Sequence, residues 1–284
     1  MAGTARKRRL FWWVVLLTAV SGCAHETLLT QADIRLYSDL GDVVKRSVPD
    51  SLVCVSYNIE YGEKLENALA DLMDNPRLWD PDILLLQEMD PEGVALMADR
   101  LGMNFAYYPS FIHPHHGKLF GTAVLSPWPL SEPRHLVLPH PNPMTENHRT
   151  ALAVDVQIGT RTVRAVSVHL STLSVDFEDR LEQATLVRDS LVADTGPAII
   201  AGDFNSGSHR EGVLFGRVVR QAGFKEAWLP VERTATGGPL DWLGIKLKLD
   251  RIYYRELELV AAGSPGESTA SDHFPVWSVF RWED

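Results

Sequence analysis

The stretch AIIAGDFNSG, residues 198–207, joins an apolar segment to two polar side chains of different chemistry. A short apolar run that is bounded by glycine and polar residues is typical of a buried strand. Asp203 and Asn205 come directly after this run. Because ligand sites of α/β proteins lie at the ends of strands, the stretch predicts a buried strand that presents an acid and an amide at the edge of a sheet.

Several other apolar segments stop in the same way. The residues concerned are Asn58 after VSY, Glu88 after ILLLQ, His169 after VSV, Asp250 within LKLDRI, and Asp272 and His273 before FPVW. Taken alone, such a residue is more often a turn residue, a solvated acid or a hydrogen-bonded core histidine than a catalytic group. Their shared position relative to the strands predicts one common site.

Strand-like and helix-like segments alternate from Leu52 onward. Strands are expected at 52–59, 82–88, 121–126, 151–158, 162–170, 197–205, 249–254 and 273–280, and helices at 63–74, 91–101 and about 176–193. The two strands that flank Gly159 and Thr160 indicate a hairpin. Early alternation with a hairpin in the middle favours mixed sheets with helices outside over a purely parallel sheet.

Two proline- and histidine-rich segments, 109–118 and 139–150, are predicted to be long loops, which often carry function. The first contains HPHHGK, residues 113–118, which we interpret as a solvated loop near the site, with metal binding or substrate contact as the alternatives. The second ends at Arg149, which could clamp a phosphate or pair with a surface acid.

The N-terminus has the order of a secretory signal. RKRR at 6–9 precedes the apolar run LFWWVVLLTAV, and VSGC ends at Cys23. The run is too short to span a bilayer comfortably, since a spanning helix needs about 20 apolar residues. VSGC resembles the lipobox of bacterial lipoproteins, so we expect residues 1–22 to be a signal peptide and acylated Cys23 to anchor the chain in the bacterial cell envelope. The alternative is cleavage near Ala24 and a secreted protein.

The rest of the chain is predicted to be a tether, residues 23–50, and one domain, residues 51–284. Without residues 1–22 the chain keeps 23 cations against 37 acids, a net charge near −14. Such a charge repels polyanions at long range, and no basic stripe is visible in the sequence. With Cys23 acylated, only Cys54 remains, so no disulfide framework is expected.

The set of polar strand-end residues supplies what phosphate-ester hydrolysis needs. The reaction requires a hard cation, a group that activates water, and an oriented histidine. Carboxylate and amide oxygens suit Mg²⁺ or Mn²⁺, which makes Glu88 the first candidate ligand, with Asp272 possible across the sheet. Asp203 fits the group that acts on water, and His273 with Asp250 fits the oriented histidine. Asn58 and Asn205 could donate to phosphate oxygens without adding negative charge.

Seven motifs, YNI, LQE, GTAVLS, VHL, GDFN, LDRI and SDH, occur in this order between residues 52 and 281. Together they resemble the endonuclease/exonuclease/phosphatase superfamily. The resemblance implies a four-layer α/β sandwich, in which two mixed, mainly antiparallel sheets pack face to face with helices outside. It also implies a divalent-metal site at one edge of the sandwich.

The resemblance assigns roles to the matching positions. Glu88 matches the metal ligand with Asn58 beside it, His169 and Asn205 match phosphate-binding positions, Asp203 matches the aspartate that orients or deprotonates water, Asp250 matches the partner of His273, and Asp272 matches a further metal contact. Either Asp203 or His273 could be the general base. VHLST and the helix that follows are more similar to the deoxyribonuclease and sphingomyelinase branches than to the repair nucleases.

The expected function is that of a metal-dependent phosphodiesterase, which we expect to be monomeric. Its substrate would be a phospholipid, a small phosphoester or extracellular nucleic acid. The alternative is a non-catalytic ligand-binding lipoprotein that retains the fold. The retained set of polar residues argues against that alternative, because loss of activity usually leaves gaps in such a set.

Overall fold

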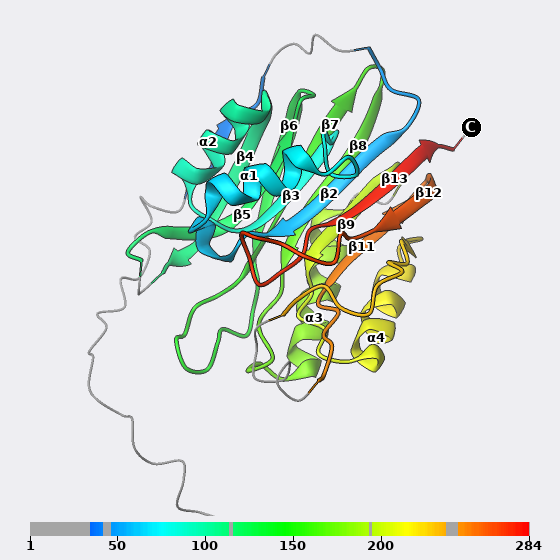
Figure 1. Cartoon of the computed structure of the whole chain (residues 1–284). Coiled ribbons are helices and arrows are strands. Elements are labelled where there is room, and N and C mark those ends of the chain that lie inside the picture. Colours follow the sequence, from blue (N-terminus) through cyan, green and yellow to red (C-terminus); the bar gives the residue numbers. More distant parts are fainter. Residues whose placement is uncertain (1–34, 42–46, 114–115, 193–194, 237–243, 284) are drawn as a thin grey trace, which may run out of the picture.

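The computed structural model describes residues 35–41, 47–113, 116–192, 195–236 and 244–283. Two sheets pack face to face, with helices on their outer sides (Figure 1). The predicted signal peptide, Cys23 and most of the predicted tether lie outside the described residues. Among those that are described, no helix is both long and apolar enough to cross a bilayer.

The first sheet has seven strands in the order β1-β4-β5-β3-β2-β13-β12. Their bounds are β1 Tyr37–Asp39, β2 Leu52–Asn58, β3 Ile83–Met89, β4 Asn104–Ile112, β5 Leu119–Ser126, β12 Leu257–Gly263 and β13 Val276–Trp282. All neighbours are antiparallel except β2 and β3, which run parallel. A parallel pair needs a crossover, which α1 (Leu65–Asp74) supplies here.

The second sheet has six strands in the order β10-β11-β9-β8-β7-β6. Their bounds are β6 Leu130–Val137, β7 Thr150–Ile158, β8 Arg161–His169, β9 Ala198–Asp203, β10 Lys225–Glu226 and β11 Asp250–Arg255. Only the pair β8 and β9 is parallel, and α3 (Phe177–Leu191) makes this crossover. The predicted hairpin is confirmed, because Ile158 pairs with Arg161 across Gly159 and Thr160.

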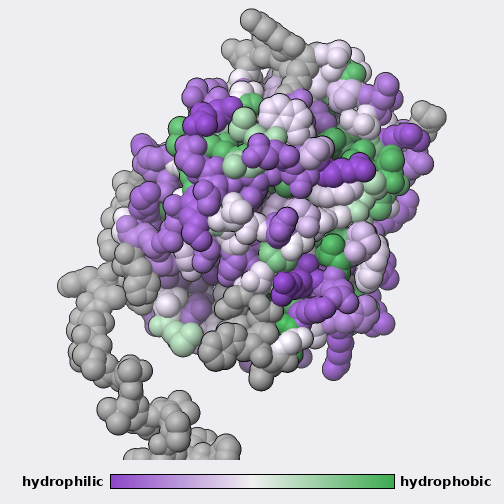
Figure 2. Space-filling model, in the orientation of Figure 1, coloured by the Kyte–Doolittle hydropathy of each residue, from purple (hydrophilic) through white to green (hydrophobic). Residues whose placement is uncertain are grey.

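Three apolar clusters separate the four layers. Alternate strand residues of both sheets, such as Leu85 and Ile199, form the central cluster. The outer face of the first sheet packs against α1 and α2 (Pro91–Leu101), and that of the second packs against α3 and α4 (His209–Arg220). This architecture confirms the predicted four-layer sandwich of two mixed, mainly antiparallel sheets. On the face shown in Figure 2, apolar residues are scattered among hydrophilic ones, as is usual for a protein surface.

Local sequence explains where α2 begins and ends. Pro91 occupies the first helical turn, and Asp90 caps it by accepting a hydrogen bond from the Gly93 backbone N–H at 2.7 Å. The helix ends at Gly102, whose φ of 65° is left-handed and favours glycine. The sequence pattern therefore predicts both ends of this helix from capping chemistry alone.

Several elements were not predicted from the sequence, namely β1, β4, β6, β10, β12 and α4, and two of them lie in segments that were given another role. Residues 109–112, predicted as part of a loop, continue β4, because the run 104–112 pairs with β5 through a register shift at Pro109 and Phe111. Tyr37–Asp39, in the predicted tether, form strand β1 and pair with Phe105–Tyr107 of β4. The first sheet therefore begins earlier in the chain than the hydrophobic pattern indicates.

Candidate active site

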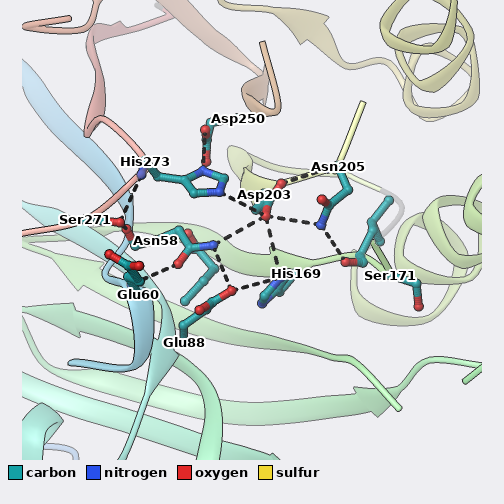
Figure 3. Close-up of polar contacts among 12 residues, drawn as sticks. Asn58, Glu60, Glu88, His169, Ser171, Asp203, Asn205, Asp250, Ser271 and His273 are labelled. Carbon is teal, nitrogen blue, oxygen red and sulfur yellow. Dashed lines mark hydrogen bonds and ion pairs between the residues drawn. The ribbon is translucent and has the colours of Figure 1, made fainter. Parts of the chain in front are cut away.

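The register of the strands brings the predicted residues to one edge of the sandwich. Asp203, the last residue of β9, pairs with His169 at the end of β8 and with Asp250 at the start of β11. In the first sheet, Asn58 ends β2 and pairs with Gln87, which precedes Glu88. Because both parallel pairs end at the same edge, side chains from two sheets meet there (Figure 3).

Asp203 lies at the centre of this group. Its Oδ2 accepts hydrogen bonds from Asn205 Nδ2 at 3.1 Å and from Asn58 Nδ2 at 3.4 Å. The Nε2 atoms of His169 and His273 lie 3.5 and 3.7 Å from the same oxygen. Two amides and two imidazoles therefore surround one carboxylate oxygen, and they come from four different strands or strand ends (Figure 3).

His273 is oriented by Asp250, as the sequence predicted. The His273 Nδ1 lies 2.9 Å from Asp250 Oδ2, and the Asp250 backbone N–H donates to Thr234 Oγ1 at 3.0 Å. Burial by itself lowers the pKa of His273, but the Asp250 and Asp203 carboxylates outweigh it and raise that pKa well above its usual value. The imidazole is therefore held as a cation at neutral pH.

The pKa values of Asp203 and His169 are also shifted, in directions that suit hydrolysis. Burial raises the pKa of Asp203 to about 7, and the positive charge of His273 opposes this shift. Burial lowers the pKa of His169 well below its usual value, and the charges of Arg149 and His273 add to the effect. At neutral pH the site thus combines a carboxylate poised to exchange a proton with one neutral and one charged imidazole.

Glu88 occupies a strained position at the end of β3. Its φ is 61°, in the left-handed region, and it falls where the pairing of β3 with β5 shifts between Gln87 and Met89. Asn58 Nδ2 donates to Glu88 Oε1 at 3.3 Å. Burial raises the pKa of Glu88, against the opposing charges of Arg149 and His273. A largely desolvated carboxylate whose charge is not fully compensated is a position where a hard cation would bind.

Two further carboxylates lie near Glu88. Asp272, the second predicted metal ligand, is exposed, and its charge raises the pKa of Glu88 after the larger effect of burial. The pKa of Glu60 is raised by burial and then by Asp272. The sequence-based set of ligands omitted Glu60, although its place two residues after Asn58 could have identified it. Carboxylate and amide oxygens are the donor types that a hard divalent cation prefers, although ligand atoms of Glu60, Glu88 and Asp272 do not all lie within 4.8 Å of one another.

A second group of potential ligands is less suited to a metal ion. Atoms of Asp203, Asp250 and His273 all lie within 4.8 Å of one another. However, Asp250 and His273 already hydrogen-bond to each other at 2.9 Å, and a cation bound there would break this pair. The Glu88 side of the site is therefore the better candidate for the ion.

Arg149 borders the site from the start of β7. Its guanidinium lies 4.9 Å from the Phe120 ring centroid and 5.6 Å from that of Phe111. Burial lowers its pKa, while Glu88 and Asp203 oppose the shift. Its Nη1 is buried and has no hydrogen-bond partner among the described residues. This unpaired donor favours the predicted phosphate contact over pairing with a surface acid.

Buried contacts hold the two halves of the site in register. Gln87 Nε2 of the first sheet donates to Ser167 Oγ of the second at 3.0 Å, and Ser167 Oγ donates to the Leu86 carbonyl at 3.1 Å. In the second sheet, a Cβ at Gly202 would lie 1.9 Å from the Val168 carbonyl oxygen, so only glycine allows β8 and β9 to approach this closely. Sequence reasoning did not identify these supporting residues.

The described part of HPHHGK forms a loop beside Glu88 in which residues 116–118 are exposed, in agreement with the predicted solvated loop near the site. The ring centroids of His113 and His116 lie 4.4 and 5.1 Å from that of Tyr61, and His116 Nε2 lies 3.4 Å from Glu63 Oε1. Tyr61 belongs to the short 3₁₀ segment Glu60–Gly62, directly after β2. The two histidines therefore pack against the segment that carries Glu60, with His113 half-buried and His116 exposed at the outer side of the stack.

Comparison with known proteins gives matches over most of the chain. The model of the endonuclease/exonuclease/phosphatase family matches residues 55–273. UPF0294 proteins of Vibrio parahaemolyticus and Vibrio campbellii are 33% and 29% identical to the chain over 122 and 126 residues. These matches cover 42% and 43% of this chain, but only 40% and 41% of the relatives' own length.

Solved structures share the fold at low sequence identity. An endonuclease/exonuclease/phosphatase from Beutenbergia cavernae is 21% identical, with a TM-score of 0.63 over 82% of this chain and 72% of that chain. D. rerio TDP2, complexed with a single-strand DNA product, gives 0.62 at 18% identity over 82% and 100%. Sphingomyelinase C from Streptomyces griseocarneus gives 0.61 at 16% identity over 81% and 99%. With its fold, its strand-end site and a family match over more than half its length, the chain belongs to the endonuclease/exonuclease/phosphatase family.

Proposed function

We propose that the protein is a divalent-metal-dependent phosphodiesterase that hydrolyses a P–O bond by in-line attack of water. Members of its family are metal-dependent phosphoesterases. The observation that carries the proposal is the meeting of Asp203 with the His273–Asp250 pair beside the half-buried Glu88. In this arrangement Asp203 can accept a proton, the imidazolium of His273 carries a positive charge, and Glu88 can bind a metal ion. The three side chains lie around one small volume.

Glu88, together with Asn58, Asp272 and Glu60, would hold a Mg²⁺ or Mn²⁺ ion. Such an ion, when bound, neutralises phosphate oxygens and stabilises the charge that develops on the departing oxygen. The family fold makes this cofactor an expectation, and carboxylate oxygens are the donor type that such an ion prefers. Removing Glu88 should therefore weaken binding of the ion more than removing an exposed carboxylate elsewhere.

Asp203 is the proposed general base. Its pKa of about 7 lets it accept a proton from water at neutral pH, whereas His273 is already protonated. As Asp203 takes the proton, the water oxygen bonds to phosphorus and the ester oxygen departs with its electron pair. Of the two candidates that the sequence left open, the pKa of Asp203 supports Asp203 rather than His273 in this role.

The remaining residues are proposed to bind the phosphoryl oxygens. The His273 imidazolium, oriented by Asp250, donates toward one oxygen, and His169 offers an N–H group beside it. The Asn205 amide already donates to Asp203 and to the Leu170 carbonyl, so it holds Asp203 in place. The buried His169 Nδ1 and Arg149 Nη1 have no hydrogen-bond partner among the described residues, which supports a role for both side chains in holding substrate. These donors are fixed before substrate arrives, so they need little reorganisation.

The substrate is proposed to be a phospholipid, a small phosphoester or extracellular nucleic acid. Structural neighbours include a sphingomyelinase and a protein solved with a DNA product, which supports a phosphodiester without choosing between these classes. A ligand-binding lipoprotein that keeps the fold without turnover is the alternative. The buried His273–Asp250 pair and the shifted pKa of Asp203 favour the enzyme.

The location is proposed from the sequence of residues 1–23. A signal peptide followed by acylated Cys23 would hold the domain at the cell envelope, next to membrane phospholipids. Radiolabelled palmitate should enter the wild-type chain during expression in a bacterium, and the label should be lost in Cys23→Ser. A chain that takes up no label would contradict the anchor and leave the enzymatic proposal standing.

The proposed activity is tested by a hydrolysis screen of the full chain in detergent. The panel contains bis-p-nitrophenyl phosphate, plasmid DNA, RNA, sphingomyelin, phosphoinositides and phosphomonoesters, each with Mg²⁺, Mn²⁺ or chelator. We expect metal-dependent turnover of phosphodiesters that is lost in Asp203→Asn. No turnover across the panel, with wild-type folding intact, would favour the binding protein.

A further inference from the structure

A cavity of about 200 Å³ opens beside the proposed metal ligand Glu88. Its walls include Tyr61, Glu63, His113, His116, Lys118 and Phe120. The cavity shares Glu88 with the proposed catalytic site and lies outside the group around Asp203. It therefore adjoins the position of a scissile phosphate without containing the residues that act on it.

Aromatic rings form one continuous wall of this cavity. The ring centroid of His113 lies 4.4 Å from that of Tyr61 and 4.6 Å from that of His116. Phe120 continues the wall at 5.6 Å from Tyr61 and reaches the catalytic group, since its ring lies 5.9 Å from His169. A flat group bound against this wall would therefore be attached close to the phosphate.

The backbone around Tyr61 adopts an unusual conformation, which sets the position of the Tyr61 ring in the cavity wall. Glu60 and Tyr61 have φ values of 37° and 62°, which side-chain-bearing residues seldom adopt, and Gly62 continues the left-handed run at 65°. Backbone strain of this kind persists where the surrounding structure holds the residues in place, and it is concentrated at ligand sites. It turns the segment after β2 so that the Tyr61 ring packs against the two histidines.

The charges around the cavity argue against a second phosphate or an acyl chain as its occupant. Lys118 is engaged with Asp90 at 3.0 Å, and Glu63 and Glu88 bring negative charge to the walls. A second phosphate would thus meet two carboxylates, while an acyl chain would desolvate them without offering hydrogen bonds. Rings with polar edges suit a group that is flat and can also form hydrogen bonds.

We propose that this cavity binds a nucleobase, so that the favoured substrate is a phosphodiester of a nucleoside. This inference rests on the proposed phosphodiesterase function and adds the chemical class of the group next to the phosphate. Base stacking on aromatic side chains tolerates different bases, because every base has a π-face. Tyr61 and His116 are the specificity-determining residues in this scheme.

The test compares three p-nitrophenyl esters that share one leaving group. They are the esters of thymidine 5′-phosphate, of phosphorylcholine and of methyl phosphate, assayed with the full chain in Mn²⁺. We expect kcat/KM for the thymidine ester to exceed that for the methyl ester by about tenfold to a hundredfold. In Tyr61→Leu and in His116→Leu this ratio should fall toward one, whereas the matched control Trp79→Leu, which replaces an exposed ring before β3, should keep it.

A binding measurement separates failure of this inference from failure of the proposed function. Calorimetric titration with thymidine 5′-monophosphate and with methyl phosphate, in Mn²⁺, measures the two affinities without requiring turnover. Their difference reports what the base contributes to binding. Tighter binding of the nucleotide that depends on Tyr61 would support the cavity even if no ester were hydrolysed. Equal kcat/KM and equal affinity for the thymidine and methyl compounds would overturn the inference and leave the phosphodiesterase standing. A Tyr61-dependent preference for the choline ester would also overturn it and show a site for quaternary ammonium groups.

Discussion

The Nδ1 of His273 lies 2.9 Å from the Oδ2 of Asp250, although the two residues are separated by 23 positions in the sequence. Both side chains are buried, so the interaction is only weakly screened by solvent. The pair fixes which ring nitrogen of His273 faces Asp203, since the other nitrogen, Nε2, lies 3.7 Å from Asp203 Oδ2. The orientation and the charge of the histidine therefore both depend on Asp250.

Replacing Asp250 tests this dependence. In Asp250→Asn the histidine loses the carboxylate that outweighs burial, so the pKa of His273 should fall and kcat should drop by about a hundredfold or more. Turnover of bis-p-nitrophenyl phosphate measures kcat, and an NMR titration measures the pKa of His273. The double variant Asp250→Asn/His273→Ala should be no slower than His273→Ala, because the pair acts as one unit. Near-normal turnover in His273→Ala would contradict the scheme.

Glu88→Gln tests the metal site. The change keeps the shape of the side chain but removes the largely desolvated charge, so the dissociation constant for Mn²⁺ should rise by roughly tenfold to a hundredfold. Isothermal titration calorimetry of the metal-free proteins measures it. Glu66→Gln is the matched control, since Glu66 is exposed on α1 and pairs with Arg100 at 3.2 Å. Unchanged affinity in Glu88→Gln would place the ion elsewhere.

Arg149→Lys tests the proposed phosphate contact. Lysine keeps the positive charge but loses the planar group that packs on Phe120 and presents the buried Nη1. We expect kcat/KM to fall about tenfold and the inhibition constant of inorganic phosphate to rise by a similar factor. Arg134→Lys in the largely exposed strand β6 serves as the control. If phosphate inhibits Arg149→Lys as strongly as wild type, Arg149 is a packing residue.

The raised pKa of Asp203 predicts how stability depends on pH in the metal-free protein. Because burial raises this pKa to about 7, the folded state binds a proton that the unfolded state has already released. The stabilisation from this proton is present at low pH and is lost as the pH rises through about 7. The free energy of unfolding should therefore fall by about 1 kcal/mol between about pH 6 and about pH 8 from this group.

The stability prediction is checked by urea denaturation in chelator at both pH values. Asp203→Asn lacks the titrating carboxylate, so its free energy of unfolding should change less over the same interval than that of wild type. If the free energy of unfolding changes with pH to the same extent in both proteins, Asp203 is ionised throughout the interval. The comparison of slopes matters more than absolute stability, because the asparagine amide also meets the donors of Asn58 and Asn205.

The sequence predicts most elements because their signals are local. The cap at Asp90 with Pro91 marks the start of α2, and the two residues between β7 and β8 mark a hairpin. Strand β4, which continues through Pro109, and the strand at Tyr37–Asp39 were missed. Both depend on pairing with strands elsewhere, β5 for the former and β4 for the latter, and such pairing leaves little trace in a short window of residues.

Within the site, the sequence identified the residues but not their relationships. Position at a strand end was enough to select Asn58, Glu88, His169, Asp203 and Asp250, because strand ends of one sheet edge converge. Glu60 was passed over as a ligand, since its approach to Asp272 depends on the turn at residues 60–62. The stacking of His113 and His116 on Tyr61 was likewise invisible, because the three rings meet only through the fold.

By itself, therefore, the apolar periodicity of the sequence predicted mixed sheets with helices outside. The order of its motifs identified the polar residues of the edge, and the family resemblance carried by those motifs implied the four-layer sandwich. Only the tertiary structure decided that Asp203 lies between two imidazoles, that the half-buried Glu88 accepts a hydrogen bond from Asn58, and that Arg149 packs on Phe120. The reason is that charge states and contacts depend on through-space distance and burial. Strand register and the packing of two sheets set these quantities for residues as far apart in the chain as Asn58 and Asp203, which are 145 positions from each other.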